Sequence, residues 1–178
     1  MALDVDPTPA LQRGWLRHSP ADADPTARGQ PPPDSRWQRG TVVDALYLAN
    51  DASTVWAEWY RHLAEAGIPP NQQLPRALWS WEIDPSLAVA DLRTPARLAR
   101  LGLGLPSLGR RTWPVYQHVG EALWREGWPG LVAPSAARPR DGLVLCLFRD
   151  AARTILAHPV PPPILIDQPP VPPLGMRT

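Results

Sequence analysis

Proline constrains this chain more than any other residue type: 25 of its 178 residues are Pro, and another 12 are Gly. The two together stay below the share of roughly 25–30% at which disorder becomes the expected state. Hydrophobic residues make up 44% of the sequence, enough to build a packed core in a chain of this length. We therefore expect one folded domain with loop-rich or extended ends.

Charge and cysteine content exclude several classes of protein. The 18 basic residues, all of them Arg, nearly balance the 17 acidic residues. A protein that binds nucleic acid directly usually has a basic excess, so we expect no such role. A single Cys excludes an internal disulfide and a multi-Cys zinc site, and the four His residues are scattered. The sequence has neither an apolar run of membrane-spanning length nor a signal peptide, so we expect a cytoplasmic protein with no membrane partner.

The spacing of apolar residues, Gly and Pro predicts helices among short strands. The expected helices cover residues 52–66, 96–101 and 112–126, and the expected strands cover residues 15–17, 45–49, 76–83, 87–92, 131–133 and 143–148. Asn50 and Asp51 are both suited to be the N-cap of the first helix, and Gly67 is suited to end it. This alternation is typical of a mixed α+β domain.

The composition changes beyond Arg153. Eight prolines fall within residues 159–178, so we expect this segment to be polyproline-like or disordered. The chain then divides into an N-terminal extension (1–13), a central domain (14–153) and a Pro-rich tail (154–178).

Five polar residues stand in an ordered series beside the apolar segments. The series is Arg17 in Trp-Leu-Arg-His, Arg36 in Arg-Trp-x-x-Gly, Tyr47 in Tyr-x-Ala, Glu58 in Ala-Glu, and Ser135 in Pro-Ser-Ala-Ala-Arg. At about 100° per residue, Glu58 lies roughly 115° from the centre of the apolar stripe of its helix. We therefore expect its carboxylate on a flank that can face a cleft.

An ordinary structural role is also open to each of these residues. Glu58 is placed to pair with Arg61 or His62 on the helix surface, and Arg36 is placed to lie over Trp37. In the same way, the strand tyrosine of the series fits a core position, and the serine that follows Pro fits the cap of a turn.

The order and spacing of the motifs resemble the RES domain family over residues 14–150. The resemblance implies a mixed sheet with flanking helices, similar to ADP-ribosyltransferase and diphtheria-toxin catalytic domains. It also implies a bacterial toxin, often paired with a helix-turn-helix antitoxin, that consumes NAD as a glycohydrolase or phosphorylase without a metal. Gln38 departs from the Asn that is common in the family, but it carries the same amide donor and acceptor groups.

Residue by residue, the resemblance assigns Glu58, Arg36 and Ser135 to catalysis, and Arg17, Arg36, Tyr47 and Ser135 to NAD binding. Cleavage of the bond between nicotinamide and ribose places positive charge on the ribose, which a carboxylate stabilises. The two guanidinium groups suit the diphosphate, and the tyrosine ring suits nicotinamide or the ribose. The serine hydroxyl is suited to donate to a phosphate or to the nicotinamide amide.

The sequence leaves the acceptor open. Water would make the protein a glycohydrolase, phosphate a phosphorylase, and a protein side chain an ADP-ribosyltransferase. The alternative from another class is a catalytically inactive RES-like module that binds a nucleotide or a protein partner.

Overall fold

The structure is a computed structural model that describes residues 2–10, 14–149 and 157–177. Its helices are α1 (Ala52–Ala66), α2 (Pro95–Arg100), α3 (Trp113–Arg125) and the short 3-10 helix η1 (Pro70–Gln73). Its strands are β1 (Pro7–Pro9), β2 (Trp15–Pro20), β3 (Asp44–Ala49), β4 (Arg76–Ile83), β5 (Ala88–Asp91), β6 (Gly130–Pro134), β7 (Leu143–Arg149) and β8 (Ala157–Ile166). The predicted α+β class is confirmed.

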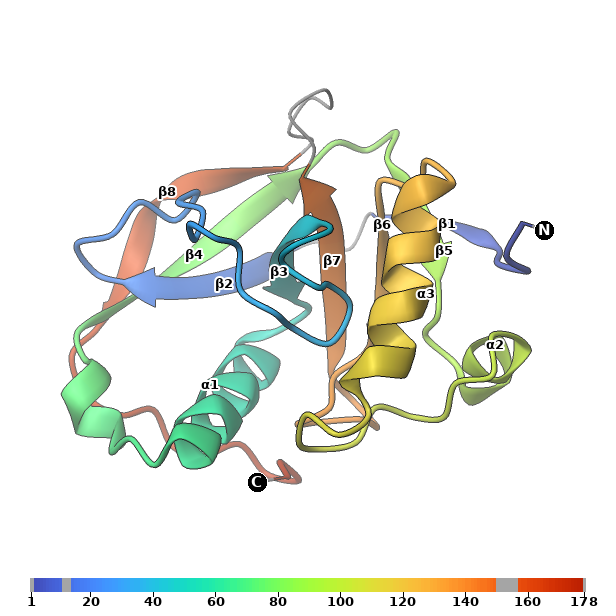
Figure 1. The fold of residues 1–178 in the computed structure, drawn as a ribbon. Coiled ribbons are helices and arrows are strands. Elements are labelled where there is room, and N and C mark those ends of the chain that lie inside the picture. Colours follow the sequence, from blue (N-terminus) through green and yellow to red (C-terminus); the bar gives the residue numbers. More distant parts are fainter. Residues whose placement is uncertain (1, 11–13, 150–156, 178) are drawn as a thin grey trace.

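Within the described ranges the strands form one mixed sheet in the order β1-β5-β6-β7-β3-β2-β4-β8. The pair β5–β6 is parallel and the other pairs are antiparallel. Figure 1 shows α1 and α3 in front of this sheet, where α1 contacts β2 and β3 and α3 contacts β6. The helices therefore cover one face of the sheet.

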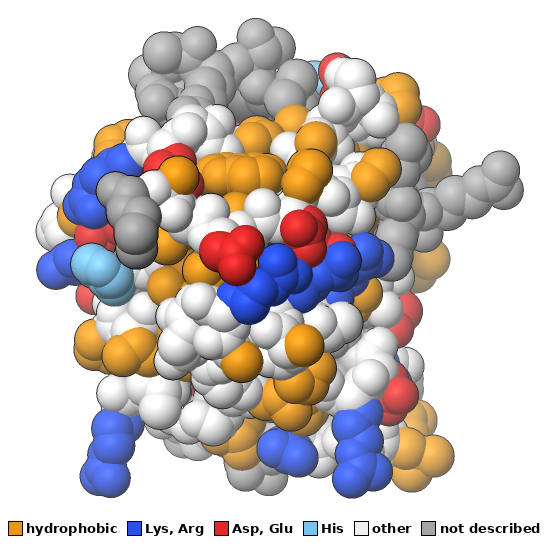
Figure 2. Space-filling view, turned by 90° about the vertical axis from the view of Figure 1, so that its right-hand side faces the viewer, with side chains coloured by type: hydrophobic (Ala, Val, Ile, Leu, Met, Phe, Trp, Pro, Cys, Tyr) orange, Lys and Arg blue, Asp and Glu red, His pale blue; other side chains and the backbone are white. Residues whose placement is uncertain are grey.

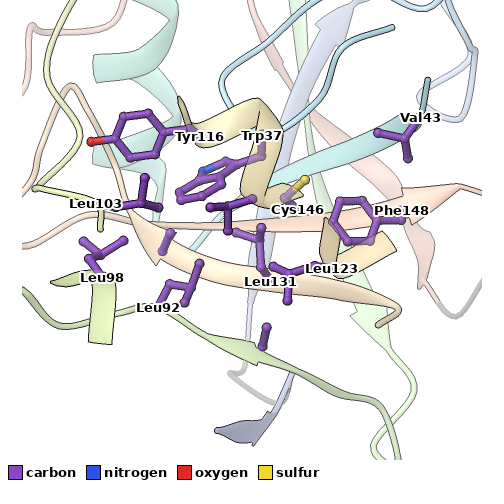
Figure 3. Packing of buried hydrophobic residues seen from close by; sticks show 13 residues of the cluster. Trp37, Val43, Leu92, Leu98, Leu103, Tyr116, Leu123, Leu131, Cys146 and Phe148 are labelled. Carbon is purple, nitrogen blue, oxygen red and sulfur yellow. The ribbon is translucent and has the colours of Figure 1, made fainter. Parts of the chain in front are cut away.

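Side-chain alternation along β3 divides the core between the two faces of the sheet. Tyr47 packs on the helix side, whereas Leu46 and Leu48 pack into a cluster on the opposite face. Figure 3 shows part of the cluster on the helix side, in which Trp37 and Tyr116 meet edge to face with ring centroids 5.1 Å apart. This packing holds the segment around Trp37 against α3.

The ends of α1 follow the sequence prediction. The Asp51 side chain accepts a hydrogen bond from the Thr54 backbone N–H at 2.6 Å, which caps the N-terminus of the helix. Gly67 adopts the left-handed conformation, with φ of 66°, and closes the C-terminus. The position of Glu58 along the helix is thereby set by local sequence signals.

The prediction that residues 159–178 are polyproline-like or disordered is wrong for residues 159–166, which belong to β8 (Ala157–Ile166). This strand pairs antiparallel with β4 at the edge of the sheet. Proline lacks an N–H donor, and an edge strand is the place in a sheet where this lack costs least. The ladder is irregular between Leu78 and Ser80, opposite the run of consecutive prolines in β8.

The N-terminal extension also contributes to the fold, because β1 pairs with β5 at the other edge. Nearby, Arg93 and Arg97 contact the buried carboxylate of Asp91, and Arg100 contacts Asp4 and Asp6. Figure 2 shows basic and acidic side chains gathered on the side of the molecule that carries α2. The ion pairs of Arg100 with Asp4 and Asp6 tie the extension to α2.

Candidate functional site

Glu58 lies on a flank of α1, as the helical spacing predicts. Val55, Trp56 and Trp59 on the same helix are buried, whereas the Glu58 side chain is 26% exposed. The carboxylate is therefore partly withdrawn from water without being enclosed in the core.

Both oxygens of the Glu58 carboxylate are engaged. Oε1 accepts hydrogen bonds from the Ser135 hydroxyl at 2.6 Å and from the Ala137 backbone N–H at 3.2 Å. Oε2 accepts a hydrogen bond from Nε of Arg61 at 2.9 Å. The structure thus brings two of the predicted catalytic residues, Glu58 and Ser135, into direct contact.

Ser135 is fully buried directly after β6. Its hydroxyl oxygen also accepts hydrogen bonds from the backbone N–H groups of Ala137 and Arg138, each at 3.1 Å. The structural role open to this serine, the cap of a turn, is therefore real, and the same oxygen also donates to Glu58. The turn and the carboxylate hold each other in place.

Arg138 connects the same turn to the start of α1. Its Nη1 donates to Asp51 at 3.0 Å and to Thr54 at 3.1 Å. The sequence motif that contains Ser135 ends in this residue, but sequence reasoning assigned it no role. A guanidinium is charged at every physiological pH and has several N–H donors, and this is the signal that could have indicated that Arg138 holds the turn on α1.

Arg36 lies in the connection from β2 to β3 and is buried near Tyr116 of α3. Its guanidinium donates to the Ser107 carbonyl and, at 3.4 Å, to the Thr112 hydroxyl. The group lies 5.2 Å from the centroid of the Tyr116 ring, so the expected stacking partner, Trp37, is replaced by Tyr116. Trp37 itself packs into the core against the same Tyr116 ring.

The charges of two α1 side chains act on Arg36. Burial lowers the pKa of Arg36, and the positive charge of Arg61 lowers it further. The negative charge of Glu58 acts in the opposite direction. These three side chains therefore share one electrostatic neighbourhood.

Tyr47 holds the segment that carries Arg36. Its hydroxyl oxygen accepts hydrogen bonds from the Ser35 hydroxyl at 2.6 Å and from the Trp37 backbone N–H at 3.1 Å. Burial raises the pKa of Tyr47 well above its ordinary value, so the phenol is neutral. The sequence left two roles open for Tyr47, a core position and a contact with NAD. In the structure it packs against the core and also positions Arg36.

The structure does not bring Arg17 to this group. On β2, His18 stacks on Trp56 of α1, and the neighbouring Arg17 faces the opposite side of the sheet. There, burial and the charge of Arg149 lower the pKa of Arg17 to about 10, and Asp44 opposes this shift. A one-residue step along a strand reverses the face, which a motif without a known register cannot reveal.

Residues 10–172 match the sequence model of the RES domain. The chain belongs to the RES domain family. The match extends past the expected limit at residue 150 and includes β8. A comparison with curated proteins found none that matches this RES domain.

The fold of this RES domain is also found in a solved structure. A chain of the M. tuberculosis MbcT–MbcA toxin–antitoxin complex matches it with a TM-score of 0.66 and 23% sequence identity, over 86% of this chain and 87% of that chain. No helix of the RES domain, in the ranges that the structure describes, is long and apolar enough to cross a bilayer. In the same ranges, His, Cys, Asp and Glu form no group of three or more that could hold a metal ion.

Proposed function

We propose that this RES domain consumes NAD by cleaving the bond between nicotinamide and ribose, with Glu58 as the catalytic carboxylate. The observation that carries this proposal is the contact of Glu58 with Ser135 and Arg61, and the charges of Glu58 and Arg61 also act on the buried Arg36. Three of these residues are the Arg, Glu and Ser that the family resemblance assigns to catalysis.

The chemistry requires negative charge at one fixed place. When the bond from C1′ of the ribose to the nicotinamide nitrogen breaks, its electron pair leaves with neutral nicotinamide, and positive charge develops on the ribose. A carboxylate that is already oriented stabilises this charge without reorganising. Ser135 and Ala137 hold one oxygen of Glu58, and Arg61 holds the other. An oxygen of water or of phosphate then bonds to C1′, and an attacking water loses its proton to solvent.

Arg36 is proposed to bind the diphosphate. Only two of its nitrogens are engaged with the Ser107 carbonyl and the Thr112 hydroxyl, and a guanidinium has five N–H donors. Tyr47 is a positioning residue in this proposal, since its hydroxyl accepts from the Ser35 side chain and from the Trp37 backbone N–H, on either side of Arg36. Arg17 has no part in it, because its side chain faces away from Glu58.

A toxin role is proposed on two grounds. The chain belongs to the RES domain family, and its fold matches a chain of a toxin–antitoxin complex. We propose that the activity arrests growth and that a protein antitoxin neutralises it by covering Arg36 and Glu58.

Glu58→Gln tests the catalytic assignment. The amide keeps the size of the side chain and an oxygen that accepts from Ser135, but it removes the negative charge. We expect nicotinamide release from NAD to fall about 100-fold or more, measured with and without phosphate. Glu65→Gln is the matched control, because Glu65 pairs with the same Arg61 from one turn further along α1, and we expect its activity to equal that of the wild type.

The same assay separates the alternatives. Release without phosphate indicates a glycohydrolase, release that needs phosphate indicates a phosphorylase, and labelling of an added protein indicates an ADP-ribosyltransferase. Binding of NAD by calorimetry with no product would favour the inactive binding module. A folded wild-type protein that releases no nicotinamide under any of these conditions contradicts the proposal.

A further inference from the structure

A second arginine faces the helices from the sheet. Arg76 begins β4, which pairs antiparallel with β2 so that Arg76 lies opposite Pro20 and Leu78 lies opposite His18. Leu78 packs with Trp56 of α1, and residues two apart on a strand share a face. Arg76 therefore faces the same side of the sheet as α1, the side from which Arg17 is turned away.

Arg76 is held by an uncharged partner. Its Nε and Nη2 lie 3.2 and 2.7 Å from Nδ1 of His18. Burial, together with the positive charges of Arg76, Arg17 and His62, lowers the pKa of His18 to about 3. The imidazole is thus neutral near pH 7, and it orients the guanidinium without adding charge.

The buried guanidinium has no acidic partner. Arg76 is 9% exposed, and no carboxylate in the described ranges forms an ion pair with it. Arg61 and Arg138, which are also withdrawn from solvent, do have such partners, whereas the buried Arg36 has none in the described ranges. A buried cation without a counter-ion is costly, and a bound anion would remove that cost.

An anion can reach this group. Nη1 of Arg76 makes no hydrogen bond within the described residues and is not among the buried unpartnered atoms there, so it keeps contact with solvent. His18, the partner of Arg76, stacks on Trp56 with ring centroids 5.5 Å apart. Trp56 precedes Glu58 by two residues on α1. Arg76 and α1, the helix that carries Glu58, therefore lie on the same face of the sheet.

We propose that Arg76, oriented by His18, binds the diphosphate of the dinucleotide together with Arg36. The inference rests on the proposed function, because it takes the substrate to be NAD. It gives Arg76 the role that the sequence motif assigned to Arg17. Planar, paired N–H donors suit the oxygens of a diphosphate.

Two substrates test the assignment. Nicotinamide riboside has the bond that is cleaved but no phosphate. We expect Arg76→Gln to lower kcat/KM for NAD roughly ten- to hundred-fold, mainly through KM, and to leave kcat/KM for nicotinamide riboside unchanged. Arg149→Gln, which alters a buried arginine on the opposite face of the sheet, is the control and should affect neither substrate. Activity on the riboside also shows that the variant is folded.

A binding measurement makes the test independent of turnover. We expect calorimetry with ADP-ribose to show a similar loss of affinity for Arg76→Gln, and a smaller loss for Arg76→Lys, which keeps the charge but not the planar fork. If Arg76→Gln turned over NAD at the wild-type rate and bound ADP-ribose normally, the inference about Arg76 would be overturned and the proposed function would stand. A loss confined to NAD in Arg17→Gln but not in Arg76→Gln would also overturn it. ADP-ribose binding that depends on Arg76, without release of nicotinamide, would overturn the proposed function alone.

Discussion

Two titratable residues near α1 have different kinds of neighbours. Glu58 accepts hydrogen bonds from a hydroxyl, a backbone N–H and a guanidinium. His18 is packed on Trp56 and faces the positive charge of Arg76. Because burial and a positive neighbour both oppose an imidazolium, His18 stays neutral in the folded protein and gains a proton only when the protein unfolds.

The low pKa of His18 in the folded protein predicts that this residue makes stability sensitive to acid. The pKa of His18 is about 3 in the folded protein, against an ordinary value near 6.5 in the unfolded chain. Between these values the unfolded state binds more protons, so the free energy of unfolding falls as the pH falls from 6.5 toward 3. From pH 7 to pH 5 we expect this residue to contribute a loss of about 2 kcal/mol. Urea unfolding at the two pH values measures it.

The comparison that isolates His18 uses two variants. His18→Gln should unfold with a smaller difference between pH 7 and pH 5, because the titrating group is gone. His118→Gln alters an exposed histidine of α3 and should keep the wild-type difference. An equal pH dependence in wild type and His18→Gln would show that His18 is protonated in the folded state.

At the scale of elements, the connection from β2 to β3 matters most, because it carries Arg36. It is fastened to α3 by Arg39, which forms two hydrogen bonds to the buried carboxylate of Glu121 at 2.8 and 2.9 Å. Gln117 of α3 donates to the carbonyls of Ser35 and Gln38. The helix thus fixes the backbone on both sides of Arg36.

Gly120 permits the close approach of these two elements. A Cβ at this position would lie 2.0 Å from the Trp37 carbonyl oxygen, which is backbone and cannot turn aside. We therefore expect Gly120→Ala to lower the free energy of unfolding by about 1–3 kcal/mol or more and to weaken NAD turnover. Denaturant unfolding and nicotinamide release measure the two effects.

Gly104→Ala is the matched substitution, because a Cβ there meets nothing within 4 Å. It should leave stability and turnover close to wild type. If Gly120→Ala behaved in the same way, the packing of α3 on the Arg36 segment would not position the site.

At the scale of the whole molecule, the candidate site joins parts that are far apart in the chain. Arg36 comes from the connection before β3, Glu58 from α1 and Ser135 from the turn after β6. The proposed toxin role leads to a prediction for the whole molecule. Expression of the wild type in a bacterial host should stop growth and deplete NAD, whereas expression of Glu58→Gln at an equal protein level should not. Growth curves and NAD measurements decide this, and unimpaired growth with active wild-type protein would contradict the toxin role.

The sequence alone was sufficient for the local structure around the candidate catalytic residues. The cap at Asp51 and the stop at Gly67 delimit α1, and the apolar stripe places Glu58 on its flank, because these signals act within a few turns of one helix. The motifs in order were also sufficient for the family. The contact of Glu58 with Ser135 was expected only through the resemblance.

Tertiary structure decided which arginine faces the helices and what the Pro-rich segment becomes. The side of the sheet on which Arg17 lies depends on the register of β2, and a shift of one residue reverses it. The strand β8 forms because β4 offers an unpaired edge, although its own composition favours no strand. Both outcomes depend on partners distant in the chain, and local sequence patterns carry no information about such partners.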